Sequence, residues 1–338
     1  MTEESSYTSQ LSVVMTTTGM TRITGENTMT PSLSRGIEFY FHCAIVVIGV
    51  VGTATNALVL YAMVASKQHK KHVLIVNQNV HDLYSSFFMV VCYSLKLCNI
   101  KLTGSFGYWL CTQLLSDGFI WSGFDGAAIN LAIITIERYL KVVHVTWSKT
   151  KLRSWMIYLA MAFSWIGPFV YVETLVFLTS AVVDGACYAY AFWMSETARI
   201  FHDIWTFMSF YVIILLIFIF CYWRILIVIR RQARVMAGYN SAAGPSTLHT
   251  VNNQIQSNVI KTMIYVSAFY AVSRLPTFIF IFNMNFNPNA TVVDSSAYYA
   301  IVMISFLYTC TNPFIYSIKF DPVKEVLHRL IICKKTSE

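Results

Sequence analysis

The sequence predicts an all-α membrane protein, a seven-transmembrane helix bundle with a short amphipathic eighth helix. Hydrophobic residues make up 56% of the 338 residues and charged residues only 12%, too little charge to cover a soluble domain. A membrane-spanning helix needs about 20 mostly apolar residues, whereas a strand of a membrane β-barrel has about ten residues that alternate between apolar and polar. Segments of the first kind lie at about 39–65, 73–98, 109–136, 155–180, 201–229, 259–284 and 296–318.

Basic residues predict how this bundle is oriented. They follow the first, third, fifth and seventh segments, for example at Lys67, Lys141, Arg230 and Lys319. The positive-inside rule therefore gives an extracellular N-terminus and a cytoplasmic C-terminus in a multi-pass protein of the plasma membrane, surrounded by membrane lipids. The net charge of +8 reflects this asymmetry, and no basic stripe with stacking aromatics predicts nucleic-acid binding.

The chain divides into three parts. Residues 1–37 form an extracellular, Ser/Thr-rich tail that we expect to be disordered and that lacks a signal-peptide core, so that the first helix acts as an uncleaved insertion signal. Residues 38–320 form the seven-transmembrane domain, in which Asn289 begins a glycosylation sequon. Residues 321–338 form the amphipathic helix and cytoplasmic tail, where Cys333 is either a palmitoylation site or a free thiol.

Two cysteines face the oxidising side in this topology. Cys111 begins the third segment, and Cys187 lies in the loop between the fourth and fifth. We therefore expect a disulfide that ties this loop to the third helix.

A series of polar and aromatic residues follows a fixed order along the seven segments. The series is Asn56, Asp82, Glu137-Arg138-Tyr139, Trp165, Tyr222, Pro276 and the run NPFIY from Asn312 to Tyr316. With the cysteine pair and the short eighth helix, this order resembles the rhodopsin-like (class A) G-protein-coupled receptors, over about residues 38 to 333.

The resemblance implies a receptor that transmits an extracellular ligand signal to a heterotrimeric G-protein. Its coupling switch would consist of Glu137, Arg138, Tyr139, Tyr222, Asn312, Pro313 and Tyr316. Arg138 would be held in the inactive state and would meet the G-protein when the sixth helix swings out. The alternatives are a simple interfacial arginine, and a non-signalling decoy or scaffold with the same fold.

An internal polar site is predicted from Asn56, Asp82, Arg274 and Asn312. The resemblance implies that the aspartate and the Asn of NPFIY help to hold a sodium ion, yet Arg274 stands where the family has tryptophan. A charge at this depth is costly unless it is paired. We expect Arg274 to pair with Asp82 and to displace the sodium ion. Pairing with Asp125, or projection into a ligand cavity towards an anionic ligand, are the alternatives.

The third and fifth segments depart from the family pattern. Cys111 and Arg138 are about two residues further apart than usual, which predicts a bulge in the third helix. The fifth segment has Ile214 where proline is common.

The ligand pocket is predicted at the outer ends of the helices. Its candidate residues are Asp117, Ile120, Trp121, Glu173, His202, Asp203 and Phe306. An acidic, aromatic-rich mouth favours a peptide ligand over a small molecule, although a membrane-interface belt also explains several of the aromatics. Ile120 and Phe306 stand where the resemblance would require the aspartate of an amine receptor and the lysine of an opsin.

Other functional classes lack their sequence signatures. No metal-ligand cluster, nucleophile motif or phosphate loop is present, so we expect no enzyme activity, no metal and no cofactor. Inverted repeats typical of many transporters are also missing.

Overall fold

The computed structural model describes residues 31–240, 247–286 and 295–319, together with Lys324, Val326 and Arg329. Asn289 and Cys333 lie outside the described residues, as do positions 1–30 of the expected tail. The three isolated positions, which belong to the predicted eighth helix, are helical.

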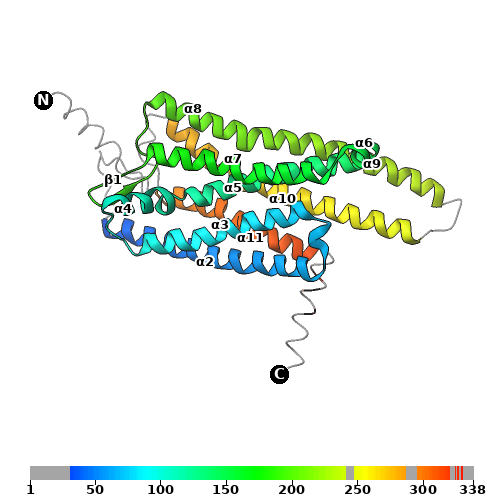
Figure 1. Ribbon diagram of the computed structural model, residues 1–338, viewed down its shortest axis with the longest axis horizontal. Coiled ribbons are helices and arrows are strands. Elements are labelled where there is room, and N and C mark those ends of the chain that lie inside the picture. The colour runs from blue at the N-terminus through cyan, green and yellow to red at the C-terminus, as the bar shows by residue number, and fades with distance from the viewer. Residues whose placement is uncertain are drawn as a thin grey trace, which may run out of the picture.

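Within these residues the chain forms a bundle of seven helical rods (Figure 1). They are α2 (Pro31–Ala65), α3 (Val73–Leu97), α4 (Gly104–Leu110) continued by η2 (Cys111–Leu115) and α5 (Gly118–Val143), α7 (Ser154–Thr179), α8 (Glu196–Phe207) continued by η3 (Met208–Val212) and α9 (Ile213–Asn240), α10 (Thr247–Phe286) and α11 (Ser295–Lys319). Short connections contain η1 (Gln68–Lys70), α6 (Val145–Lys151) and strands β1 (Ala181–Val183) and β2 (Ala186–Tyr188). The predicted seven-helix bundle is confirmed.

Helix α2 begins earlier than the sequence predicts. Residues 31–37 were expected in the disordered tail, but the helix starts at Pro31. Proline is favoured at the first helical position, because its fixed φ suits the helix and its missing N–H would have no intrahelical partner there. The tail prediction is therefore wrong for these residues.

By length and composition, five of the described helical segments are apolar enough to cross a membrane. Helices α3 and α11 are not among them. These two carry buried polar side chains such as Asp82 and Asn312, which face each other in the interior. Their lower hydropathy therefore reflects an inward polar face.

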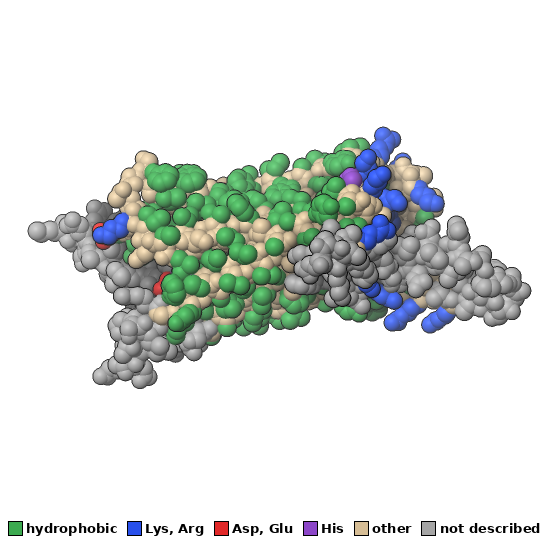
Figure 2. Space-filling model, turned by 90° about the horizontal axis from the view of Figure 1, so that it is seen from below, with side chains coloured by type: hydrophobic (Ala, Val, Ile, Leu, Met, Phe, Trp, Pro, Cys, Tyr) green, Lys and Arg blue, Asp and Glu red, His purple; other side chains and the backbone are tan. Residues whose placement is uncertain are grey.

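The two ends of the bundle differ in charge and covalent structure. One end, called here the hairpin end, carries the antiparallel pair β1–β2 and the disulfide between Cys111 and Cys187. The predicted disulfide is thus confirmed. At the other end, called here the basic end, Lys and Arg side chains gather, while hydrophobic side chains cover the middle of the visible face (Figure 2).

The predicted bulge in the third rod is present. Residues Cys111–Leu115 form a π-helical turn, and Asp117 follows in the left-handed region with φ 61°. The turn accommodates extra residues between the disulfide and α5, as π-bulges do. A second π-helical turn, η3, lies in the fifth rod just before Ile214, where the sequence lacks proline.

The β-hairpin turns at Asp184-Gly185, both with positive φ. This dipeptide suits the tight turn, which requires left-handed residues at its centre. Val182 pairs with Cys187, and the disulfide joins this strand to η2. The hairpin is thereby held against the third rod.

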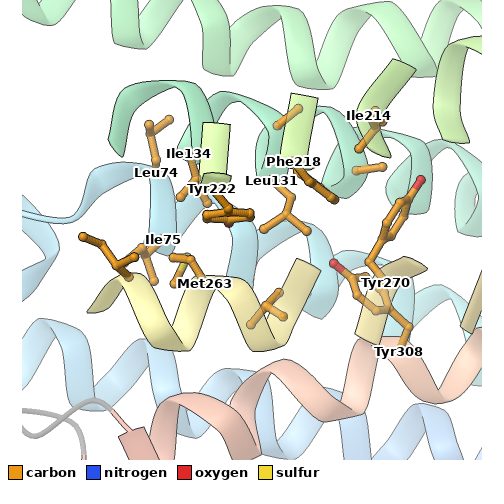
Figure 3. Packing of buried hydrophobic residues seen from close by; sticks show 14 of the residues in the cluster. Leu74, Ile75, Leu131, Ile134, Ile214, Phe218, Tyr222, Met263, Tyr270 and Tyr308 are labelled. Carbon is orange, nitrogen blue, oxygen red and sulfur yellow. The ribbon is translucent and has the colours of Figure 1, made fainter. Parts of the chain in front are cut away.

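Towards the basic end, the buried core joins six rods, including α2 through Val59, Ala62 and Met63. Leu74 and Ile75 of α3 meet Leu131 and Ile134 of α5, with side chains from α9, α10 and α11 (Figure 3). The labelled members of this cluster from the last three helices are Ile214, Phe218, Tyr222, Met263, Tyr270 and Tyr308. Helix α5 packs against α3, α7, α9 and α10, so it is the central rod of the bundle.

Helices α3, α5 and α7 approach closely at Gly126. The His81 ring stacks on Trp165 at 3.8 Å between centroids, and a Cβ added to Gly126 would lie 2.6 Å from both His81 Cε1 and the Ser164 carbonyl oxygen. Such a contact has no room for a methyl group.

We expect Gly126→Ala to destabilise the protein by about 1–3 kcal/mol through overpacking. Gly167→Ala is the matched control, since its nearest contact would be the movable Phe163 ring at 3.5 Å. Thermal unfolding of the detergent-solubilised protein tests this. Equal melting temperatures for the two variants would contradict the close packing at Gly126.

Candidate functional site

A cavity of about 680 Å³ opens at the hairpin end between the rods and the hairpin. Of the described residues that line it, the charged ones are Glu38, Lys96, Lys101, Asp117, Asp125, Asp184, Asp203 and Arg274. Five of these are acidic and three are basic, so the lining carries a net negative charge. The volume lies in the range of small-molecule sites.

Asp117 projects into the cavity from the end of the π-helical turn. It accepts a hydrogen bond from Lys96 at 2.6 Å and one from the Tyr93 hydroxyl at 3.2 Å. The lysine and aspartate side chains are 8% and 15% exposed, so this is a largely buried ion pair. The bulge therefore directs Asp117 towards α3.

A hydrogen-bonded row lines the wall formed by α7 and α8. His202 Nδ1 lies 3.2 Å from Asp203 Oδ1, and His202 Nε2 lies 3.3 Å from the Thr206 hydroxyl. That hydroxyl lies 2.9 Å from the Tyr171 hydroxyl. If Nδ1 carries the proton, each group donates to the next from Tyr171 to Asp203, which fixes the imidazole orientation.

The floor of the cavity holds a second ion pair. Arg274 Nη2 lies 3.4 Å from Asp125 Oδ1, and each side chain is 7% exposed. Three rings surround the guanidinium carbon, with centroids at 5.3 Å (Trp121), 5.5 Å (Phe124) and 6.0 Å (Phe278). Such distances permit cation–π attraction, which is stronger away from water.

The predicted pair between Arg274 and Asp82 is wrong. Depth is not the reason, since His81, beside Asp82, packs on Gly126, beside Asp125. The reason is the direction in which Arg274 leaves α10. The preceding residue, Ser273, faces α11, because its carbonyl accepts a hydrogen bond from Ser305. Arg274 lies about 100° further round α10 and therefore faces α5. Both alternatives left open by the sequence are present: Arg274 pairs with Asp125, and it lines the cavity.

Asp82 lies instead in a polar interior beneath the cavity. Its Oδ2 accepts a hydrogen bond from Asn312 at 2.7 Å. Asn56 donates to the carbonyls of Gly52 and Thr309 at 2.9 and 3.0 Å, linking α2 to α11. The structure thus divides the predicted internal site: Asn56, Asp82 and Asn312 share this interior, and Arg274 belongs to the cavity.

The predicted pocket residues are only partly brought together. Those that line the cavity are Asp117, Trp121, His202, Asp203 and Phe306. Ile120 and Glu173 do not line it, so the prediction is wrong for these two. Ile120 is fully buried in an apolar cluster, because the bulge sets the phase of the early turns of α5. The carboxylate of Glu173, a residue of α7, lies beside Gly118.

At the basic end, Arg138 is held by two neighbours. Its Nε lies 3.3 Å from Glu137 Oε2, and its Nη2 lies 3.4 Å from His72 Nδ1. Lys141 also pairs with Glu137, one turn further along α5. Since arginine only donates, His72 Nδ1 accepts in this contact. Burial, and next the Arg138 guanidinium, lower the pKa of His72 from 6.5 to about 4.

The other predicted switch residues are distributed along the same region. Tyr222 bridges Thr135 and Ser267, at 3.0 Å from each hydroxyl. The Tyr139 hydroxyl lies 3.1 Å from His144 Nε2. Pro313 and Tyr316 are residues of α11, and the side chain of Tyr316 lies outside the described positions.

Sequence reasoning did not identify two site residues. Lys96 was not among the predicted pocket residues, although a lysine near the outer helix ends is a signal for an acidic partner. His72 directly precedes α3 at the basic end and gave no periodic signal. Both contacts join residues more than 20 positions apart.

A family model described as "7 transmembrane receptor (rhodopsin family)" matches residues 55–316. The chain belongs to this family. The receptor is also similar to a curated relative, the human "C-C chemokine receptor type 8", with 24% identity over 299 residues that cover 86% of this chain and 77% of the relative. The Macaca mulatta protein of the same name is 24% identical over 310 residues, with the same shares covered.

The fold of the receptor is similar to that in the "Crystal structure of squid rhodopsin". The TM-score is 0.72 at 16% identity, over 93% of each chain. Members of the family are receptors in the membrane, so the expectations of a rhodopsin-like receptor and of no enzyme are confirmed.

We expect Asp125→Asn in this receptor to cost about 3–5 kcal/mol, because it leaves the buried Arg274 charge unpaired. The double variant Asp125→Asn/Arg274→Gln removes both charges and should melt above the single variant. Thermal unfolding of the four members of the cycle measures the coupling between the residues. Additive effects of the two substitutions would contradict a functional ion pair.

The lowered pKa of His72 predicts a pH effect. Folding favours the neutral imidazole, so its contribution to stability is present above pH 6.5 and is lost as the pH falls towards 4. His72→Asn keeps an acceptor near Nδ1 and does not titrate. Between these pH values the melting temperature of wild type should therefore fall more steeply than that of His72→Asn. Parallel pH profiles would show that His72 does not contribute.

Proposed function

We propose that this protein is a plasma-membrane receptor that binds an extracellular ligand in the cavity and transmits the signal to a heterotrimeric G-protein. The observation that carries the proposal is the span of α5. Trp121 and Asp125 of this helix line the cavity, and Arg138 near its other end is held by Glu137 and His72. A ligand that shifts α5 or α10 can thus reach a breakable contact at the far end.

In the proposed orientation the hairpin end lies outside the cell and the basic end lies in the cytosol. The distribution of Lys and Arg follows the positive-inside rule (Figure 2). The Cys111–Cys187 disulfide belongs on the oxidising side of the membrane. Both features support an extracellular N-terminus and a cytoplasmic C-terminus.

A peptide is the favoured ligand, with a small molecule as the alternative. The net negative lining suits a ligand with basic groups. Glu38 and Asp184 extend this charge to the α2 and hairpin walls, so that it is distributed around a wide opening. The curated relatives are named for chemokines, which is consistent with a polypeptide ligand.

A non-signalling decoy with the same fold is the second candidate function. It is favoured by Arg274, which replaces the tryptophan expected at this position of α10 and fixes α10 to α5 through Asp125. A decoy would bind its ligand without passing the signal to a G-protein.

Association of the purified receptor with nucleotide-free G-protein α-subunits of each class distinguishes the two functions. We expect one class to associate with wild type, and Arg138→Ala to weaken this association at least tenfold, because it removes the guanidinium that Glu137 and His72 hold at the basic end. Arg153→Ala, which removes an exposed arginine from the same end, is the control and should associate like wild type.

The opposite result is equally informative. If no class associates, the decoy function is supported. If Arg138→Ala associates as well as wild type, G-protein binding through Arg138 is excluded.

A further inference from the structure

The Arg274 guanidinium at the floor of the cavity has unused hydrogen-bond donors. Its Nε and Nη1 have no hydrogen-bond partner by geometry among the described residues, but protein atoms cover both, and the Tyr270 hydroxyl is near enough to hydrogen-bond to the guanidinium. Nη2 carries two N–H groups, and its bond to Asp125 is 3.4 Å long, which is long for a charged pair. Since the side chain is 93% buried and lines the cavity, the second N–H of Nη2 is the donor that a ligand there would meet.

The partner of Arg274 is also incompletely used. The Asp125 carboxylate has two oxygens, and among the described residues its one hydrogen bond is to Arg274. It lines the cavity beside the guanidinium, within electrostatic reach of His202. The floor therefore presents a cation and an anion side by side, each with bonding capacity left.

Charge balance restricts what can bind there. A purely anionic group on Arg274 would compete with Asp125 and place two carboxylates around one guanidinium. A purely cationic group on Asp125 would draw the carboxylate away from Arg274 and leave that charge without its partner. Breaking a buried pair in this way costs several kcal/mol.

A group that carries both charges avoids either cost. Its anion would accept from the second N–H of Nη2, and its cation would meet Asp125, so that four charges of alternating sign lie next to each other. The rings of Trp121, Phe124 and Phe278 around the guanidinium leave an apolar, water-poor site in which these contacts are strengthened.

We propose that the part of the ligand that reaches this floor is zwitterionic, with a carboxylate bound by Arg274 and an ammonium bound by Asp125 on neighbouring carbons. An α-amino acid has this arrangement; a peptide end that has a terminal charge and a side chain of opposite sign carries both charges at a wider spacing. This inference rests on the proposed function in one respect, that the cavity is the ligand site.

Three indole compounds test the charge requirement. L-Tryptophan carries both groups, tryptamine lacks only the carboxylate, and indole-3-propionate lacks only the ammonium. Each is titrated to millimolar concentration against the purified full-length receptor, and its dissociation constant is obtained from the rise in melting temperature. Tryptophan should bind about tenfold or more tightly than either analogue, which corresponds to one charged hydrogen bond.

Two variants separate this site from nonspecific stabilisation. The double variant Asp125→Asn/Arg274→Gln leaves no unpaired charge and should lose the preference for tryptophan. Arg199→Gln removes an arginine of the hairpin end that pairs with Glu196 and does not line the cavity. It should retain the preference.

Three results would overturn the proposal: no stabilisation by any of the compounds, equal binding of an analogue that carries one charge, or an unchanged preference in the double variant. Because the melting temperature does not involve a G-protein, such a failure leaves the G-protein association experiment unaffected. Failure of that association, with the tryptophan preference intact, would instead favour the decoy function.

Discussion

The bundle depends on one constraint: polar groups in its interior must be paired within the protein, since the surrounding lipid offers them nothing. The main interior contacts follow from it. Asn56 bonds carbonyls on α2 and α11, Asn312 bonds Asp82, and Arg274 bonds Asp125. Apart from the bond of Asn56 to its own helix, each contact joins different helices, so the register of the rods is fixed where apolar packing alone would permit sliding. Polar pairing therefore specifies the arrangement of helices that the hydrophobic core stabilises.

Helix α5 shows the effect of this constraint at several levels of the bundle. Its first part is shaped by the π-helical turn and the disulfide, which direct Asp117 towards Lys96. Its middle carries Asp125, and its last turns carry Glu137 and Arg138. A rigid helix with a polar contact at each level connects the cavity to the basic end without a long chain of intermediates. Coupling between the cavity and the basic end then requires only that one ion pair on α5 can be either formed or broken.

The sequence was sufficient for some features of the site and insufficient for others. The bulge in the third rod could be predicted because an excess of residues between Cys111 and Arg138 must be absorbed somewhere. The partner of Arg274 could not, because Asp82 and Asp125 lie at similar depth and differ only in direction. Ile120 was misplaced for a related reason, since a π-helical turn rotates the residues that follow it by an amount that sequence spacing does not give. Glu173 was misplaced because its carboxylate lies beside Gly118 of another helix.

The sequence by itself determined the fold class, the disulfide and the order of the switch residues, because hydrophobic length, compartment and motif order are one-dimensional properties. Only the tertiary structure decided which charges meet. Lys96 with Asp117, His72 with Arg138 and Arg274 with Asp125 are contacts between helices, set by rotation and tilt. A rotation of one helix by one residue, about 100°, exchanges one partner for another at no change in composition. For that reason the chemistry of the cavity floor, an arginine and an aspartate side by side, became visible only in the folded chain.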